Sequence, residues 1–157
     1  MDTKYIFYYN TPVGILGIVE KDSMITNVFF GKTQLKENII IKESELIKMT
    51  ITELDEYFNG KRKSFSVKLN PFGTKFQRAV WDELIKIPYG ETVSYKRIAE
   101  NIGHDKAYRA VGLANHLNPI PIMIPCHRVI GSNGKLIGYA GGMRIKKLLL
   151  DLEKSYL

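Results

Sequence analysis

Apolar residues recur with different periods in the two halves of this chain, and that change constrains its fold most. Before residue 70, three runs rich in aromatic and β-branched residues predict strands. These runs are residues 5–9, 15–20 and 24–30. Spacings of three and four over residues 44–58 predict a helix with one apolar face, and alternation over 65–69 predicts one more strand. Residues 1–70 are therefore expected to form a small α/β domain of antiparallel strands plus a helix.

Helical patterns dominate residues 71–157, after a boundary that contains Pro71 and Gly73. Thr74 and Gln77 have the spacing of a capping box, which predicts a helix start. A helix capped by Ser94 and a second helix over residues 107–117 then give a helix-turn-helix pattern, and a last amphipathic helix is predicted over 143–154. Two short helices around a glycine also occur in proteins that do not bind DNA.

The charge of the chain is concentrated in its C-terminal half. The net charge is +7, with 10 Lys and Arg against 9 Asp and Glu in residues 1–73, and 13 against 7 in residues 74–157. Lysine and arginine release counterions from phosphates, so this excess favours a polyanionic partner. A basic, well-solvated surface has the same composition. If nucleic acid is the partner, residues 74–157 are expected to bind it.

The chain has one cysteine, Cys126, which excludes an internal disulfide. Its three histidines show no metal-type spacing, so no metal is expected. A lone cysteine is either a small apolar core residue or a reactive thiol.

The sequence around Cys126 favours the reactive thiol. Prolines at 119, 121 and 125 predict an extended, rigid approach to it, and His127 follows directly. Adjacent side chains seldom face each other, so we expect a water to bridge the thiol and the imidazole. A carboxylate on the far nitrogen of His127 would fix its tautomer. Glu153 is a candidate, although its position also suits a solvated helix residue.

The segment from Asn118 to Ile130, with Pro125-Cys126-His127-Arg128 inside it, resembles the active-site signature of the O6-alkylguanine-DNA alkyltransferases. Further matches extend over most of residues 71–157, whereas residues 1–70 carry little motif similarity. The matching segments are Phe76-Gln77, Val80-Trp81, 87–92, Ser94-Tyr95, 107–112, 138–142 and 148–153.

The resemblance implies an α+β protein with two domains. An N-terminal α/β domain, residues 1–70, would precede a mainly helical C-terminal domain, residues 71–157, of winged-helix type with a helix-turn-helix. Such a protein flips O6-alkylguanine, chiefly O6-methylguanine, out of duplex DNA. It transfers the alkyl group irreversibly to its own Cys126, so each molecule acts once.

The resemblance also implies residue roles. Cys126 would accept the alkyl group, His127 and Glu153 would form its proton relay, Asn118 would brace the segment, and Tyr95 would protonate or hydrogen-bond the departing guanine. Val129, Tyr139 and Ala140 would form the base pocket. Arg109 would fill the space of the flipped nucleotide, and Arg128 would also bind DNA. Small residues would let the second helix approach the minor groove: Ala107, Ala110, Gly112 and Ala114. Ala140 stands where some members have serine, which leaves the substrate range open.

No cofactor motif is present, because no glycine-rich loop follows a predicted strand. The animal members bind a structural zinc, but its ligands are absent here, so none is assigned. No signal sequence or membrane-spanning run is evident, which predicts a cytoplasmic protein. The expected partner is double-stranded DNA containing O6-alkylguanine, bound by a monomer and not at a membrane.

Three other functions are compatible with parts of the sequence. A protein that binds alkylation damage without transfer would share this fold, but such relatives have tryptophan at the cysteine position. A transcription regulator with Cys126 as a redox sensor would use the helix-turn-helix for operator binding. A cysteine protease would need a separate His and Asn or Asp in its own arrangement, which is not apparent.

Overall fold

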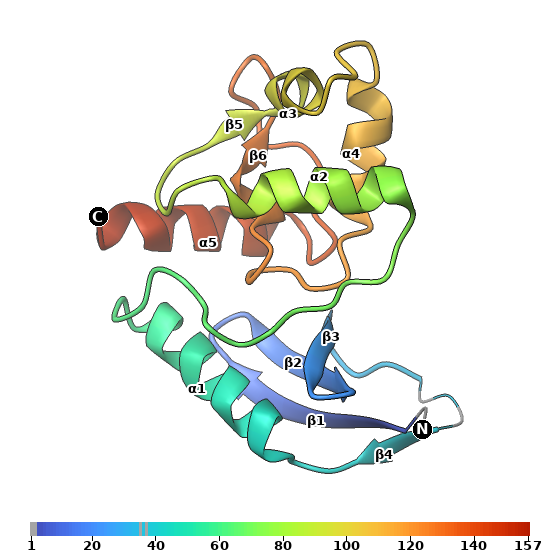
Figure 1. The fold of residues 1–157 in the computed structure, drawn as a ribbon. Coiled ribbons are helices and arrows are strands. Elements are labelled where there is room, and N and C mark those ends of the chain that lie inside the picture. Colours follow the sequence, from blue (N-terminus) through green and yellow to red (C-terminus); the bar gives the residue numbers. More distant parts are fainter. Residues whose placement is uncertain (1–2, 35, 37) are drawn as a thin grey trace. The chain divides into compact units, whose positions relative to one another are not determined.

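The computed structural model describes residues 3–34, 36 and 38–157 and divides the chain into two compact units, Met1–Pro71 and Phe72–Leu157. The first unit is a sheet with one helix, and the second is mainly helical (Figure 1). The predicted α+β class is therefore confirmed.

The first unit is built on a four-stranded sheet in the order β3-β2-β1-β4. Its strands are β1 (Lys4–Thr11), β2 (Gly14–Lys21), β3 (Met24–Phe30) and β4 (Ile39–Ile41). The first three pair antiparallel, as predicted for the N-terminal domain. Helix α1 (Glu45–Phe58) packs against these three strands, and Ser44 caps it by accepting a hydrogen bond from the Ile47 backbone N–H.

One prediction for this unit is wrong. Residues 65–69 form no strand; only Leu69 makes an isolated parallel bridge, to Ile25. The backbone N–H of Ser66 donates instead to the buried Glu53 carboxylate, so it cannot form a hydrogen bond with a neighbouring strand. The extra strand is β4, which pairs parallel with β1, so the sheet is not purely antiparallel.

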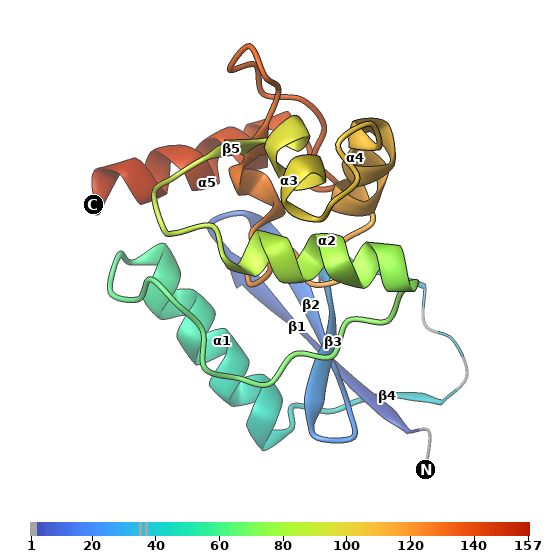
Figure 2. The same cartoon turned by 45° about the horizontal axis from the view of Figure 1, so that its top comes forward.

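The second unit packs three helices against each other: α2 (Lys75–Ile85), α3 (Tyr95–Asn101) and α4 (Tyr108–His116) (Figure 2). The capping box predicted at Thr74 and Gln77 is present, with both of its hydrogen bonds. Trp81 is buried and its indole N–H donates to the Ala114 carbonyl at 2.9 Å, which ties α2 to α4.

The remaining elements of this unit carry the cysteine segment. Strands β5 (Val93–Ser94) and β6 (Val129–Ile130) form a short parallel pair, and α5 (Met143–Ser155) packs against a single 3-10 turn, Cys126–Arg128. No helix among the described residues has the length and apolarity needed to cross a membrane.

Candidate active site

Cys126 begins the 3-10 turn, directly after a segment that the Asn118 side chain holds in place. The Asn118 amide donates to the Ile124 carbonyl at 2.8 Å and accepts from the Ile120 N–H at 2.9 Å. Ile122 has φ +75°, a conformation that β-branched residues rarely adopt, so this approach is strained as well as braced. The position of Cys126 is therefore fixed by the segment that directly precedes it.

The Cys126 thiol is almost fully buried. Burial raises the pKa of the Cys126 thiol to about 11, although the Asn118 side chain and the charge of Lys146 act in the opposite direction. At neutral pH the resting group is thus the thiol, which is a poor nucleophile. A reaction at this sulfur needs a base.

His127 has the properties of that base. Its Nε2 lies 2.6 Å from Glu153 Oε2, and because a carboxylate only accepts, Nε2 carries the hydrogen. Nδ1 is then the free acceptor, and it has no hydrogen-bond partner among the described residues. Burial lowers the pKa of His127 against the opposing effect of Glu153, so the ring is neutral near pH 7. The other reading, Glu153 as a solvated helix residue, is wrong, because it is only 1% exposed.

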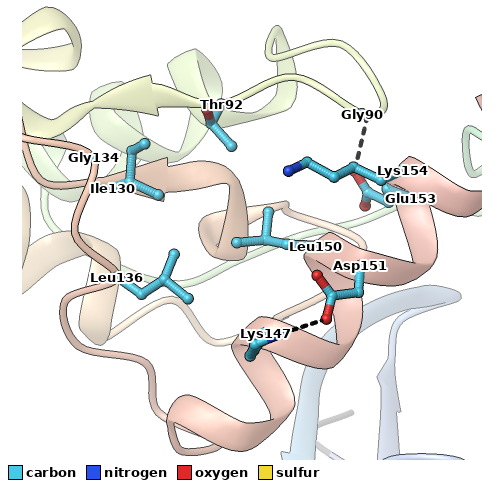
Figure 3. A pocket seen from close by; sticks show the side chains of 10 residues that line it. All are labelled: Gly90, Thr92, Ile130, Gly134, Leu136, Lys147, Leu150, Asp151, Glu153 and Lys154. Atoms are coloured by element: carbon cyan, nitrogen blue, oxygen red, sulfur yellow. Dashed lines mark hydrogen bonds and ion pairs between the residues drawn. The ribbon is translucent and has the colours of Figure 1, made fainter.

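The carboxylate of Glu153 is itself held on several sides. It accepts a hydrogen bond from the Gly90 backbone N–H at 2.9 Å, and Figure 3 shows the Glu153 side chain extending from α5 to Gly90. Arg128 donates to both of its oxygens, at 2.9 and 3.0 Å. These contacts fix the orientation of the carboxylate, and through it the ring of His127. A small cavity of about 260 Å³ lies along this part of α5 and shares Gly90 and Glu153 in its wall.

The prediction that Arg128 binds DNA is contradicted by this arrangement. Its side chain is buried, its Nη1 donates to the Ile87 carbonyl at 2.7 Å, and its guanidinium lies over the Tyr89 ring. Glu153 accepts from its Nε and Nη2, so the buried guanidinium is engaged inside the protein and is not available to a phosphate. Arg128 instead supports the relay.

Lys146 is a site residue that the sequence analysis missed. Its ammonium is buried and donates to three backbone carbonyls, those of Val129 at 2.6 Å, Ile137 at 2.9 Å and Gly138 at 3.2 Å. Burial lowers the pKa of Lys146 to about 8, while the nearby Cys126 raises it. The burial of Lys146 could have been expected from the sequence, because Lys146, Leu149 and Glu153 follow one another at helical spacing on one face of α5.

Tyr95 lies at a cavity of about 660 Å³ in the same unit. Its hydroxyl donates to the Ile137 carbonyl at 2.8 Å, and burial raises its pKa, so it stays protonated. The cavity is lined by Tyr95, Lys96, Asp105, Lys106, Tyr108, Gly131, Ser132 and Ile137. The other predicted pocket residues, Val129, Tyr139 and Ala140, are not in this lining; Val129 and Tyr139 are buried and Ala140 is exposed.

The outer face of α4 presents the predicted DNA-contacting residues. Arg109 and Ala110 are exposed, and Ala107, the N-cap, and Gly112 are half-buried. Ala114 is buried on the inner face of α4, so it is not among the small residues that would let this helix approach the groove.

A second missed residue, Asn115, lies on the inner face of α4. Its amide donates to the Cys126 carbonyl at 3.3 Å, and it is 3% exposed. The sequence alone does not distinguish Asn115 from the other asparagines, because its burial depends on how α4 packs in the fold. In the described part of the chain, no group of three or more His, Cys, Asp or Glu side chains could hold a metal ion.

Comparisons with known proteins agree with this site. The model of the 6-O-methylguanine DNA methyltransferase DNA-binding domain matches residues 75–155, and that of the ribonuclease-like domain of the same methyltransferase matches residues 4–71. The chain therefore belongs to the 6-O-methylguanine DNA methyltransferase family, as its motifs suggest.

The similarity to individual relatives extends over nearly the whole chain. A methylated-DNA–protein-cysteine methyltransferase of Methanosarcina acetivorans is 47% identical over 154 residues, covering 96% of this chain and 99% of the relative. The constitutive enzyme of Bacillus subtilis is 45% identical, covering 94% and 95%. The crystal structure of Mycobacterium tuberculosis OGT in complex with DNA has a TM-score of 0.91 at 43% identity, covering 97% of this chain and 94% of that one.

Proposed function

We propose that this protein repairs DNA by transferring an alkyl group from O6 of guanine to Sγ of its own Cys126. The observation that carries the proposal is the buried thiol followed by a neutral His127, whose Nε2 is locked onto Glu153 and whose Nδ1 is free to accept a proton. Relatives of nearly equal length are named for transfer of a methyl group from DNA to a protein cysteine.

The transfer is a displacement at the alkyl carbon. The Cys126 proton passes to Nδ1 of His127, which we expect to occur through one water, and the thiolate attacks the carbon bound to O6. An S–C bond forms while the C–O6 bond breaks, and the electron pair of that bond goes to the purine. The purine regains a proton, for which the Tyr95 hydroxyl is the proposed donor. The charge of Lys146 stabilises the thiolate during the reaction.

The DNA is proposed to bind the outer face of α4. A base inside a duplex is out of reach of a buried thiol, so the damaged nucleotide must be extruded at a cost of about a few kcal/mol. Arg109 is exposed in the first turn of α4, where it can fill the vacated stack. Val129, Tyr139 and Ala140 are proposed to contact the base once it has entered. In this scheme α3 and α4 act as the helix-turn-helix, in the minor groove, with Ala107, Ala110 and Gly112 against the sugar-phosphate walls.

A thioether is a poor electrophile, so neither water nor a neighbouring side chain is expected to remove the alkyl group from Cys126. We therefore propose one turnover per molecule, by a monomer acting in the cytoplasm without a cofactor. The alternative of damage recognition without transfer has less support, because Cys126 and its relay are both present and the full-length relatives carry transferase names.

Peptide mapping tests the proposal. Duplex DNA with a labelled O6-methyl group is incubated with the protein, and the digested protein is analysed by mass spectrometry. The peptide that contains Cys126 is expected to gain one methyl group. The Cys126→Ala variant should still bind the duplex but leave the lesion intact. Label on another residue, or repair by Cys126→Ala, would contradict the proposal.

A further inference from the structure

Asn115 presents an unsatisfied acceptor beside the nucleophile. Its Nδ2 donates to the Cys126 carbonyl, and since a carbonyl only accepts, this contact fixes which end of the amide faces the cysteine. The other end, Oδ1, is buried and has no hydrogen-bond partner among the described residues. Buried polar atoms in folded proteins are nearly always paired with protein, water or a ligand.

The neighbours of this amide locate it at the reacting end of the site. One is the Cys126 backbone, and the other is Tyr95, whose hydroxyl group interacts with the Asn115 side chain. Asn115 therefore lies between the alkyl acceptor and the residue proposed to contact the departing purine. It is not part of the relay, because neither ring nitrogen of His127 forms a hydrogen bond with it.

We propose that Asn115 is a specificity-determining residue, whose Oδ1 accepts a hydrogen bond from the 2-amino group of the flipped base. This inference rests on the proposed function, because it names the base that the same site prefers. O6-alkylguanine within DNA has no proton on N1, so its only N–H donors are the two hydrogens of the 2-amino group. A side-chain acceptor that contacts this base therefore has no other N–H donor to pair with.

Once the base is enclosed, each hydrogen of its amino group needs an acceptor, and two buried carbonyl oxygens near Cys126 are candidates. The Val129 carbonyl has one lone pair engaged by Lys146 at 2.6 Å, which leaves the second for one amino hydrogen. Asn115 Oδ1 takes the other. A lesion that lacks the amino group, such as an O6-alkylated hypoxanthine or an O4-alkylated thymine, leaves Oδ1 unpaired and is expected to react more slowly.

The test compares two free bases that differ only in this group, O6-benzylguanine and 6-benzyloxypurine. The second-order rate constant of each is measured with the parent protein and with Asn115→Leu, and the ratio of the two rates is compared. A variant that lowers the reactivity of Cys126 itself slows both bases by the same factor, so the ratio of the two rates does not change. We expect the parent to prefer O6-benzylguanine by on the order of tenfold, the usual consequence of leaving one buried acceptor unpaired. In Asn115→Leu the ratio is expected to fall close to one.

Two further variants keep the result interpretable. Asn115→Asp retains an acceptor oxygen and should keep the preference even if both rates drop. Asn101→Leu removes an exposed amide of α3 and should leave the ratio unchanged. An equal preference in the parent and in Asn115→Leu would overturn the inference, as would no preference in the parent. Failure of the parent to react with either base, while correctly folded, would instead overturn the proposed function.

Discussion

The reactivity of Cys126 depends on two pKa values that burial moves in opposite directions. The pKa of the thiol is raised to about 11, and that of His127 is lowered from the ordinary value of 6.5. At any pH between these two pKa values the sulfur is protonated and the imidazole is neutral. These are the states needed for a proton to pass from the thiol to the imidazole. The proposed relay is therefore expected to work over a broad range around neutral pH.

The pH dependence of the reaction with O6-benzylguanine tests this pairing. For the parent, the rate should be level near neutral pH and should fall only as the pH drops through the lowered pKa of His127. His127→Ala should lose about 10²–10⁴ in rate at neutral pH. Its rate should then rise about tenfold per pH unit toward the thiol pKa near 11, because only spontaneous ionisation is left.

The control for this measurement is His116→Ala, which removes an exposed histidine at the end of α4. Its pH profile should match that of the parent, since a free base does not use the outer face of that helix. Parent-like rates in His127→Ala would show that the imidazole is not the base.

At the scale of elements, Lys146 links α5 to two other segments. Its three donors join the helix to β6 and to the carbonyls of Ile137 and Gly138, which precede Tyr139. The same Ile137 carbonyl accepts from Tyr95, so one short stretch is held by α3 and α5 together. The lowered pKa of Lys146 means that burial, and not an ion pair, dominates its environment.

Lys146→Met is expected to lower the free energy of unfolding by about 1–3 kcal/mol, because the buried Val129 carbonyl loses its donor. Amide hydrogens of Gly138 and Tyr139 should also exchange faster. Denaturant titration and hydrogen exchange measure the two effects. Lys147→Met, which removes the exposed neighbouring lysine paired with Asp151, is the matched control. Equal stability of the two variants would contradict this role of Lys146.

Arg109 lies exposed in the first turn of α4, the helix proposed to contact DNA. Arg109→Ala should slow transfer from duplex DNA more than transfer from O6-benzylguanine, because a free base leaves no gap in a stack. Single-turnover rates on both substrates check this. Arg78→Ala, an exposed arginine on α2, removes the same charge and should affect both substrates little. Equal losses on both substrates in Arg109→Ala would refute the insertion.

Local sequence patterns were enough to predict most of the elements. Thr74 and Ser94 cap helices where the sequence predicts, and the aromatic runs form strands β1 to β3. Strand β4 was missed because three consecutive isoleucines show no alternation, and it forms only by pairing with β1.

The roles at the site depended more on contacts between distant residues. Arg128 looks in the sequence like a basic residue available to phosphate, and only its contact with Glu153, 25 residues later, shows otherwise. Lys146 and Asn115 were missed for the same reason: a helix period indicates which face is buried, but not which carbonyls a buried polar group meets there.

For the whole molecule, charge is expected to determine affinity for DNA more than base sequence does. Residues 74–157 carry 13 Lys and Arg against 7 Asp and Glu, which suits a phosphate-dominated interface. The logarithm of the binding constant should therefore fall linearly with the logarithm of salt concentration, with a slope of about 0.9 per neutralised phosphate. Unmodified and O6-methylguanine duplexes of different sequence should share that slope. Binding that is insensitive to salt would exclude such an interface.

The proposed mechanism lets Cys126 accept one alkyl group, after which the thiol is never regenerated. It is tested most directly by a titration in which a fixed amount of protein meets increasing amounts of duplex containing O6-methylguanine, and repaired guanine is counted after long incubation. We expect a plateau at one lesion per protein molecule, however long the reaction runs. Repair that continues past that equivalence would contradict it.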